Sequence, residues 1–248
     1  MISVTIMVKN GQLHLEKVLE ALHRFDEIVV VDTGSCDASR DIAKAFSNVR
    51  LYEKPFIGFG PTHNVASSLA TNDWILSIDA DEVASQELVE EILSLDLQED
   101  TVYRIGRKNY YQGKWIWGCG WYPDCPLRLY NRKKTRFTDA LVHESIETEG
   151  LKVATLKSPL SHYPYSTISD FLAKMQSYST LFAEQNRGKK KSSLISAIGH
   201  GSFAFFKSYV LKYGILLGKE GFIISLYNGH TAYYKYLKLL DLNDQNRV

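Results

Sequence analysis

The sequence predicts an α/β fold in which a mostly parallel β-sheet carries helices on both faces. Two observations lead to this prediction. Short apolar runs alternate with amphipathic segments along the first third of the chain, and polar residues gather just after three of the runs. The chain has 248 residues, of which 45% are hydrophobic and 23% charged, so it can form one such domain with a helical extension.

The alternation places four strands and three helices in this region. Apolar runs typical of buried strands occupy residues 3–8, 27–31, 49–52 and 74–78, and helical patterns occupy residues 14–25, 39–46 and 62–70. Parallel sheets of this kind bind ligands at the carboxyl ends of their strands. The polar residues that fall there are Asn10, the cluster at residues 32–37 and the cluster at residues 79–82.

The second half of the chain has a different character. Residues 103–122 are rich in aromatic residues and glycine, and the Arg-Leu-Tyr segment at residues 127–130 is expected to form a β-hairpin with residues 136–137. Residues 168–187 have the pattern of an amphipathic helix. From Ser192 onward the chain is apolar, aromatic and basic.

Composition and charge exclude several classes of protein. The net charge is +1, and no recognition motif accompanies the lysine run at residues 189–191, so we expect no nucleic-acid partner. Three cysteines without a zinc-binding spacing are typical of a reducing cytoplasm. We find no signal-peptide pattern and no apolar run near the roughly 20 residues of a membrane-spanning helix. We therefore expect a cytoplasmic protein, with the surface of a membrane as a further possible location.

Asp79 and Asp81 form the strongest chemical signal in the sequence. They follow the apolar run at residues 74–78, and in an extended segment residues i and i+2 point to the same side. Two carboxylates held that close repel each other unless a cation joins them. Mg²⁺ and Mn²⁺ suit such oxygen ligands and commonly bridge carboxylates to phosphate oxygens, so we expect a divalent metal here. The alternative is a solvated helix start with Asp81 or Glu82 near the N-cap.

Four segments together carry a family resemblance. In chain order they are Ser3–Ile6 with Asn10, Val30–Asp37, His63-Asn64 and Ile78–Glu82. Over residues 1 to about 90, this combination resembles the family 2 glycosyltransferases of the GT-A fold. The resemblance implies a Rossmann-like sheet with flanking helices, a nucleotide-diphospho-sugar donor, a divalent metal (Mg²⁺ or Mn²⁺) and transfer with inversion.

The resemblance assigns roles to residues of these segments. Asp32 would bond the base or ribose of the donor, Asp79 would lie near its ribose or sugar, and Asp81 would bind the metal together with Asp79. His63 stands near the expected diphosphate, where many relatives have arginine. Without a donor, residues 32–37 would be a plain turn with a helix cap. The expected donor site as a whole comprises Asn10, Asp32, His63, Asn64 and Asp79.

Inverting transfer needs a base that deprotonates the acceptor hydroxyl on the face opposite the leaving diphosphate. A carboxylate from the second half of the chain suits this role, and Glu144 and Asp124 are the candidates. His143 is a candidate for a further metal ligand. The alternatives are that Glu144 forms a structural ion pair with Arg128 or Arg136, and that His143 is a hydrogen-bonded structural residue.

The C-terminal part carries a narrower resemblance. Residues 206–221 and 234–239, together with the segment at residues 127–130, resemble the beta-1,4-glucosyltransferases of bacterial lipopolysaccharide core biosynthesis. Leu217 stands where relatives often carry aspartate. The resemblance implies transfer of a hexose, with glucose from UDP-glucose expected, to a lipid-linked oligosaccharide of the lipopolysaccharide or lipooligosaccharide core.

With the resemblance, we expect a GT-A catalytic domain at residues 1–165 and a helical, basic and aromatic extension at residues 166–248. Within the domain, residues 1–100 form the nucleotide-sugar-binding half and residues 101–165 the acceptor side. Between residues 187 and 219 the chain has seven Lys or Arg and no Asp or Glu. This pattern suits peripheral binding to the inner face of the cytoplasmic membrane, and the alternative is a structural helical cap.

Other functions stay open at this point. The acceptor can be another surface glycan, a peptide or a protein. A phosphatase or phosphotransferase would also use an Asp-x-Asp motif, but usually on the first strand, which here ends in Lys9-Asn10. A sugar-nucleotide-binding module without turnover is the alternative outside enzymes.

Overall fold

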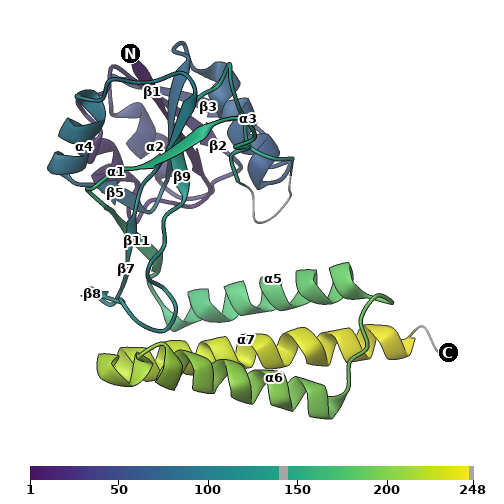
Figure 1. The fold of residues 1–248 in the computed structure, drawn as a ribbon. Helices are drawn as coiled ribbons and strands as arrows, with labels where there is room; N and C mark the ends of the chain where they lie inside the picture. Colours follow the sequence, from purple (N-terminus) through teal and green to yellow (C-terminus); the bar gives the residue numbers. More distant parts are fainter. Residues whose placement is uncertain (140–144, 246–248) are drawn as a thin grey trace. The chain divides into compact units, whose positions relative to one another are not determined.

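The computed structural model describes residues 1–139 and 145–245, which form two compact units. Unit 1 consists of Met1–Lys108 and Asp124–His162, and unit 2 consists of Asn109–Pro123 and Tyr163–Val248. The predicted boundary after residue 165 differs from this division in two segments, because residues 109–123 and 163–165 belong to the same unit as the C-terminal helices. Figure 1 shows the elements of both units.

Unit 1 is built on a seven-stranded sheet with the order β10-β6-β9-β4-β1-β2-β3. The strands β4, β1, β2 and β3 are parallel, whereas β9 runs antiparallel between β4 and β6. The predicted mostly parallel sheet is therefore confirmed. The strands are β1 (Ile2–Val8), β2 (Glu27–Asp32), β3 (Val49–Glu53), β4 (Trp74–Asp79), β6 (Thr101–Arg104), β9 (Leu127–Asn131) and β10 (Lys152–Thr155).

The central strands are apolar on both faces because helices and loops cover both sides of the sheet. Val29, Val31 and Ile75 belong to one core cluster with Ala66 of α3 and Tyr130 of β9. The helices of unit 1 are α1 (Leu15–Ala21), α2 (Ser39–Lys44), α3 (Phe59–Leu69) and α4 (Gln86–Leu93).

A second sheet has the strand order β5-β11-β7-β8. The strands are β5 (Glu82–Ala84), β7 (Arg107–Tyr111), β8 (Lys114–Trp115) and β11 (Leu160–Tyr165). Both β7 and β11 begin in unit 1 and end in unit 2. Within unit 1, β11 pairs antiparallel with β5 and places His162 opposite Glu82.

The expected hairpin between residues 127–130 and 136–137 does not form. Instead β9 pairs with β4 and β6, and Phe137 bridges to Ile146. The reason is the burial of Leu129 and Tyr130, which are fully enclosed in the main sheet and therefore need neighbours on both sides.

Unit 2 contains three long helices, α5 (Ile168–Asn186), α6 (Leu194–Phe206) and α7 (Lys219–Asp244). A π-helical turn, η1 (Lys207–Leu211), and a 3₁₀ turn, η2 (Gly214–Leu217), connect α6 to α7. α7 packs against both other helices, as Figure 1 shows. The core of unit 2 combines residues of the 109–123 segment with residues of the helices, namely Tyr111, Ile116, Cys119, Phe171, Leu217 and Ile224.

The helices α6 and α7 approach closely at two glycines. A Cβ atom at Gly201 would lie 2.9 Å from Cβ of Tyr233, and one at Gly229 would lie 3.1 Å from the carbonyl oxygen of Gly201. Larger side chains at these positions would force the two helices apart.

Within residues 1–139 and 145–245, no helix combines the length and the apolar character that crossing a bilayer requires.

Candidate functional site

The polar residues expected at the carboxyl ends of β1, β2 and β4 do meet at one edge of the main sheet. β1 lies between β2 and β4, so the ends of β2 and β4 are about 10 Å apart, two strand spacings. Asp32 ends β2 and Asp79 ends β4. We call this side of unit 1 the carboxyl edge.

The loops that follow β1 and β2 are tied together by hydrogen bonds. Asn10 has a left-handed φ of 54°, which asparagine tolerates, and its side-chain oxygen accepts a bond from the Cys36 N–H at 2.9 Å. The Asn10 N–H donates to Oγ of Ser35 at 2.9 Å, and the Gly11 N–H donates to Oγ of Ser39 at 2.8 Å. Asn10 thus fixes the loop around Asp32 in this structure, and its donor-binding role stays a prediction.

Asp32 is buried, and in the described part of the chain only one of its two carboxylate oxygens has hydrogen-bond partners. Its Oδ1 accepts bonds from the N–H groups of Gly34 and Ser35 at 3.1 and 3.0 Å. Its Oδ2 has no hydrogen-bond partner among the described residues 1–139 and 145–245. A buried carboxylate oxygen without a partner is costly, so this atom is a ready acceptor for a donor group of a ligand.

A network of ion pairs joins the end of β4 to β7 and β9. Arg128 contacts Asp79 through its NH2 atom and donates to Oε1 of Glu82 at 2.5 Å. Arg107 donates to the same Glu82 oxygen at 2.9 Å and to Oδ2 of Asp124 at 2.9 Å. Glu82 is fully buried, and its other oxygen accepts from the Asp79 N–H at 3.0 Å. Two guanidinium groups therefore hold three carboxylates in place.

The network keeps Asp79 ionised. Burial by itself opposes the charge of Asp79, but the neighbouring cationic groups, Arg128 first, hold the pKa of its carboxyl well below the usual range. Burial likewise opposes the charge of Arg128, and Asp79 and Glu82 outweigh it, so the pKa of Arg128 is raised. Nε of Arg128 is buried without a hydrogen-bond partner among the residues described.

Asp81 lies in the turn between β4 and β5 rather than in an extended segment. The expectation that residues i and i+2 of an extended segment point to the same side therefore does not apply to Asp81. The turn sets its position instead. Nε2 of His162 lies 3.5 Å from Oδ1 of Asp81, and His162 is also a neighbour of Asp79. Burial lowers the pKa of His14, and the charge of Asp81 opposes this shift. Asp79 and Asp81 thus share histidine neighbours.

The described residues fit only one type of divalent-metal site, in which the protein supplies few of the ligands. No three His, Cys, Asp or Glu side chains in residues 1–139 and 145–245 form a cluster that could hold an ion alone. Mg²⁺ and Mn²⁺ sites of nucleotide-using enzymes instead take one or two carboxylates and complete their shell with phosphate oxygens and water. The side chains of Asp79 and Asp81 are 34% and 37% exposed, which suits this second type.

The side chains of His63 and Asn64 make contacts with other residues of unit 1. His63 is buried, stacks on Phe137 at a centroid distance of 4.5 Å and lies 3.2 Å from Oγ of Ser77 through Nδ1. Burial lowers the pKa of His63 to about 4, with a further contribution from Arg128, so the ring is neutral at pH 7. The Asn64 amide donates to the Phe137 carbonyl at 2.9 Å and accepts from the Phe137 N–H at 3.0 Å. The donor-binding roles of both residues stay predictions.

The two candidate bases differ in what the structure shows of them. Asp124 lies in the Arg107 ion pair. Glu144 and His143 lie outside the described residues. Of the two arginines considered as partners of Glu144, Arg128 contacts Asp79 and Glu82, and Arg136 pairs with Asp139 at 3.1 Å.

Sequence reasoning missed the part that Arg107, Arg128 and Glu82 play in organising this edge. A general signal existed, because buried carboxylates at a strand end need cationic partners. The sequence does not tell which of its arginines supply them, since Arg107 and Arg128 lie 25 or more residues further along the chain.

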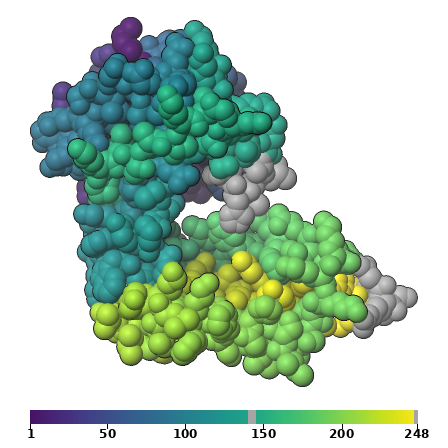
Figure 2. Space-filling view, in the orientation of Figure 1, coloured from purple at the N-terminus to yellow at the C-terminus, as the bar shows by residue number. Residues whose placement is uncertain are grey.

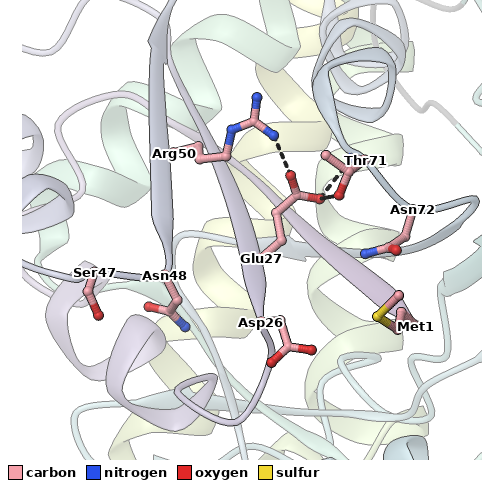
Figure 3. Close-up of a pocket in the computed structure, with 8 residues that line it drawn as sticks. All are labelled: Met1, Asp26, Glu27, Ser47, Asn48, Arg50, Thr71 and Asn72. Atoms are coloured by element: carbon pink, nitrogen blue, oxygen red, sulfur yellow. Dashed lines mark hydrogen bonds and ion pairs between the residues drawn. The ribbon is translucent and has the colours of Figure 1, made fainter.

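The opposite edge of the sheet holds a pocket of about 340 Å³ at the amino ends of the strands. Figure 3 shows Glu27 between Arg50 and Thr71 in this pocket. Glu27 accepts bonds from Arg50 at 2.6 Å and from the N–H and Oγ1 of Thr71 at 2.8 Å each, and it also bonds the Ser3 hydroxyl. The pocket lies away from all the residues of the carboxyl edge, and we call its side of unit 1 the amino edge.

Comparisons with known proteins point in one direction. The family model described as Glycosyl transferase family 2 matches residues 3–147, more than half of the chain. An uncharacterized glycosyltransferase of Rickettsia bellii is 28% identical over 263 residues, which covers 98% of this chain and 87% of the relative. The lipopolysaccharide core biosynthesis glycosyltransferase LpsC of Rhizobium meliloti is 27% identical over 252 residues, which covers 96% of this chain and 91% of LpsC.

Among solved structures, S. aureus TarS 1-349 in complex with UDP-GlcNAc is similar in fold. The TM-score is 0.51 at 14% sequence identity, and the match covers 99% of this chain and 91% of that chain. At this identity the likeness concerns the fold alone.

Proposed function

We propose a reaction for this chain from the premise that it belongs to glycosyl transferase family 2 and is a glycosyltransferase. The proposed reaction is the inverting, metal-dependent transfer of a hexose from a UDP-sugar to a lipid-linked sugar of the lipopolysaccharide or lipooligosaccharide core. The expected donor is UDP-glucose. One observation carries the proposal: Asp32, Asp79 and Asp81 lie at one edge of the sheet. Oδ2 of Asp32 has no hydrogen-bond partner among residues 1–139 and 145–245, and the side chains of Asp79 and Asp81 are partly exposed.

The position of Asp32 supports a nucleotide donor. Its Oδ2, which has no hydrogen-bond partner in the described part of the chain, can accept from an N–H group of uracil or from a ribose hydroxyl. Because the ends of β2 and β4 are two strand spacings apart, the diphosphate of the same donor would then lie near Asp79 and Asp81. TarS, which shares the fold, is known in complex with UDP-GlcNAc, and this supports a UDP-sugar as the class of donor.

Asp81, with Asp79 beside it, would hold the divalent ion. Such an ion, when bound, supplies the positive charge that stabilises the leaving diphosphate. Arg128 keeps Asp79 ionised at neutral pH, so this carboxylate is ready to bind without losing a proton first. Arg107 and Arg128 together fix the direction of the turn that carries Asp81 by holding Glu82 at its far end.

The acceptor hydroxyl must lose its proton to a base on the far side of the donor sugar. We retain Glu144 and Asp124 as the two candidates, with Glu144 first. Asp124 is held by Arg107 in an ion pair. His143 stays a proposed additional metal ligand.

The relationship to LpsC supports a lipopolysaccharide core sugar as the acceptor. Such an acceptor is anchored in a lipid bilayer, so we also propose that the enzyme works at the inner face of the cytoplasmic membrane. Another surface glycan, a peptide or a protein is the alternative acceptor, and a donor-binding module without turnover is the alternative outside enzymes.

Donor binding is tested by thermal unfolding with UDP-glucose, UDP-GlcNAc, a GDP-sugar and a CMP-sugar, each with and without Mn²⁺. A ligand at 100 times its Kd stabilises the folded state by about 2.7 kcal/mol, so a true donor gives a clear rise in Tm. We expect the largest rise with a UDP-sugar and Mn²⁺ together. A larger rise with the GDP-sugar would contradict the role given to Asp32.

Turnover is tested by the release of UDP from UDP-glucose in the presence of Mn²⁺ and lipid-linked acceptor. A binding module would show the rise in Tm without any release of UDP. Replacing Glu144→Gln should lower turnover by about 10²–10⁴-fold with little change in donor binding, because glutamine keeps the shape and loses the basicity. An active Glu144→Gln variant beside an inactive Asp124→Asn variant would identify Asp124 as the base.

A further inference from the structure

The outer face of α6 carries large apolar side chains that no other part of the described chain covers. Between Ser192 and Phe206 there is no charged residue. One side of α6, with Ala197 and Gly201, is buried against α7. The other side carries four large apolar side chains that are between 49% and 84% exposed, namely Ile195, Ile198, Phe203 and Phe206.

The spacing of Ile195, Ile198 and Phe206 shows that they form one stripe, and Phe203 lies beside it. Positions 195, 198, 202 and 206 follow each other at intervals of three or four residues, which places them on one side of a helix. Ser202 is the small uncharged residue within this stripe. α6 has 13 residues and is therefore about 20 Å long.

The apolar surface continues beyond α6. η1 exposes Val210 and Leu211, and η2 exposes Ile215 and Leu216. In Figure 2 the atoms of α6 and the two turns are coloured green to yellow-green. We call the exposed apolar residues of α6, η1 and η2 the α6 face. Soluble proteins rarely leave this many large apolar side chains exposed on consecutive elements, so the α6 face points to a partner.

Basic residues lie at both ends of the α6 face. Lys189–Lys191 precede α6, and Lys207, Lys212 and Lys219 lie within or after η1, with no acidic residue between Arg187 and Lys219. Long basic side chains beside an apolar helix face are typical of helices that lie in the headgroup layer of an anionic bilayer.

A second copy of the chain fits this surface less well. A two-fold interface brings the same patch of each copy together, so lysines would face lysines without any acidic residue to compensate them. An anionic lipid surface offers the opposite charge and an apolar interior at once. The charge pattern therefore favours lipid as the occupant.

We propose that the α6 face inserts into the interfacial layer of an anionic bilayer, with α6 parallel to the membrane plane and the lysines at the headgroups. Apolar insertion is the main contribution, and attraction between lysines and lipids adds to it. This assignment deepens the membrane association proposed above, because it names the contact surface, and it does not depend on the sugar donor.

The test is co-sedimentation with vesicles of phosphatidylcholine and phosphatidylglycerol, about three to one, and with vesicles of phosphatidylcholine alone. The variant is the triple substitution Ile195→Gln, Ile198→Gln and Phe206→Gln. The matched control replaces three apolar residues of similar exposure outside the α6 face, namely Leu93→Gln, Ile168→Gln and Leu172→Gln, of which the last two lie on α5 of the same unit.

The full chain should bind the anionic vesicles and stay at least half bound at about 0.5 M NaCl, where charge attraction is strongly screened. The triple variant should lose at least about ten-fold in partition coefficient, because it removes three inserted apolar side chains. The control should stay within about two-fold of the unsubstituted chain. Both variants should keep the Tm and the release of UDP without vesicles, so a loss of binding cannot come from misfolding or from a damaged donor site.

Three results would overturn the proposal. The triple variant could bind as well as the control, or the unsubstituted chain could leave the vesicles completely at high salt, which would show that lysines alone hold it. The chain could also bind neither kind of vesicle and form dimers that are absent in the triple variant. The α6 face would then be an interface between copies. Vesicle binding through the α6 face without any release of UDP would support this proposal and contradict the proposed function.

Discussion

The two edges of the unit 1 sheet each bury a carboxylate beside arginine, and they satisfy it differently. At the amino edge, Glu27 is 7% exposed and both of its oxygens accept hydrogen bonds from protein donors. At the carboxyl edge, Oδ2 of Asp32 and Nε of Arg128 lack partners among residues 1–139 and 145–245. At the amino edge both oxygens of Glu27 are bonded within the protein, whereas the carboxyl edge keeps polar atoms available for a ligand.

The difference teaches which ion pairs stabilise the fold and which prepare a site. A buried charge whose bonds are all made within the protein contributes rigidity. A charged group that is partly exposed and beside atoms without partners can exchange a protein contact for a ligand contact. Substitutions at the two edges should therefore separate stability from activity.

The largest effect is expected from Asp81→Asn at the carboxyl edge. Loss of a carboxylate ligand should lower metal-dependent turnover by about 10³-fold, since the leaving diphosphate is then poorly stabilised. Stability should hardly change, because the Asp81 side chain is partly exposed and asparagine keeps its shape. UDP release at saturating Mn²⁺ measures the first effect and urea unfolding the second. Asp26→Asn, the same change at the amino edge, is the control and should leave turnover intact. If Asp81→Asn keeps turnover within threefold of normal, Asp81 does not bind the metal.

Arg128→Met should affect stability and donor binding together. It leaves the fully buried Glu82 and the partly exposed Asp79 beside a neutral side chain, and breaking the buried pair with Glu82 costs about 3–5 kcal/mol. The pKa of Asp79 should rise toward its ordinary value because the main cation that lowers it is gone. Urea unfolding and NMR titration of Asp79 check the two outcomes.

Arg24→Met is the control for this substitution, since Arg24 and Glu90 form an exposed pair at 3.7 Å. It should change stability by less than about 0.5 kcal/mol. If Arg128→Met unfolds no more easily than Arg24→Met, the Arg128 network does not stabilise the fold and the predicted loss of stability is wrong.

Glu27→Ala should cost stability without affecting turnover. It leaves Ser3, Thr71 and Arg50 without their shared acceptor, and we expect a loss of about 3 kcal/mol in the free energy of unfolding. Glu53→Ala is the matched control at an exposed carboxylate that pairs with one arginine. Reduced UDP release by folded Glu27→Ala, measured below its unfolding transition, would show that the amino edge also influences the site.

The same carboxylate gives a pH prediction. Burial opposes ionisation of Glu27, but hydrogen bonds from Ser3 and Thr71 and the contact with Arg50 hold its pKa below the ordinary value of 4.5. Its contribution is therefore complete above about pH 4.5 and is lost as pH falls through the lower pKa of the folded state. Urea unfolding between pH 6 and pH 3 should show a steeper loss for the unsubstituted chain than for Glu27→Gln, and parallel curves would refute the linkage.

The smallest effect is expected from Asn64→Ala. Two hydrogen bonds to the Phe137 backbone are lost, which costs about 1–3 kcal/mol. If Asn64 also contacts the donor, as the family resemblance implies, the Kd for UDP should rise beyond what the loss of stability explains. Calorimetric titration with UDP and Mn²⁺ distinguishes the two cases, with Ser68→Ala on the exposed side of the same helix as the control.

The sequence predicts the first part of the fold well, because periodicity there reports local burial directly. All four expected strands and three expected helices of residues 1–80 occur, with ends shifted by a few residues, and the family resemblance was confirmed by the match over residues 3–147. The predicted helix at residues 168–187 is α5, Ile168–Asn186. Local patterns of this kind need no knowledge of distant partners.

Pairing between distant segments was harder to predict. β9 was expected in a hairpin with its neighbours along the chain, yet it lies between β4 and β6. Strand pairing depends on which surfaces are left after other strands have paired, and a single strand pattern does not contain this information. The same limit hid Arg107 and Arg128, whose positions at the carboxyl edge follow from the path of β7 and β9.

The discontinuity of unit 2 has a consequence for how the chain folds during synthesis. Tyr111, Ile116 and Cys119 find their partners Leu217 and Ile224 only after roughly 100 further residues have been made. At about 5–20 residues per second, synthesis of these residues takes about 5–20 s. During this interval the apolar side chains of residues 109–123 have no completed core, so we expect any chain that stops before α7 to be a target for chaperones and proteases.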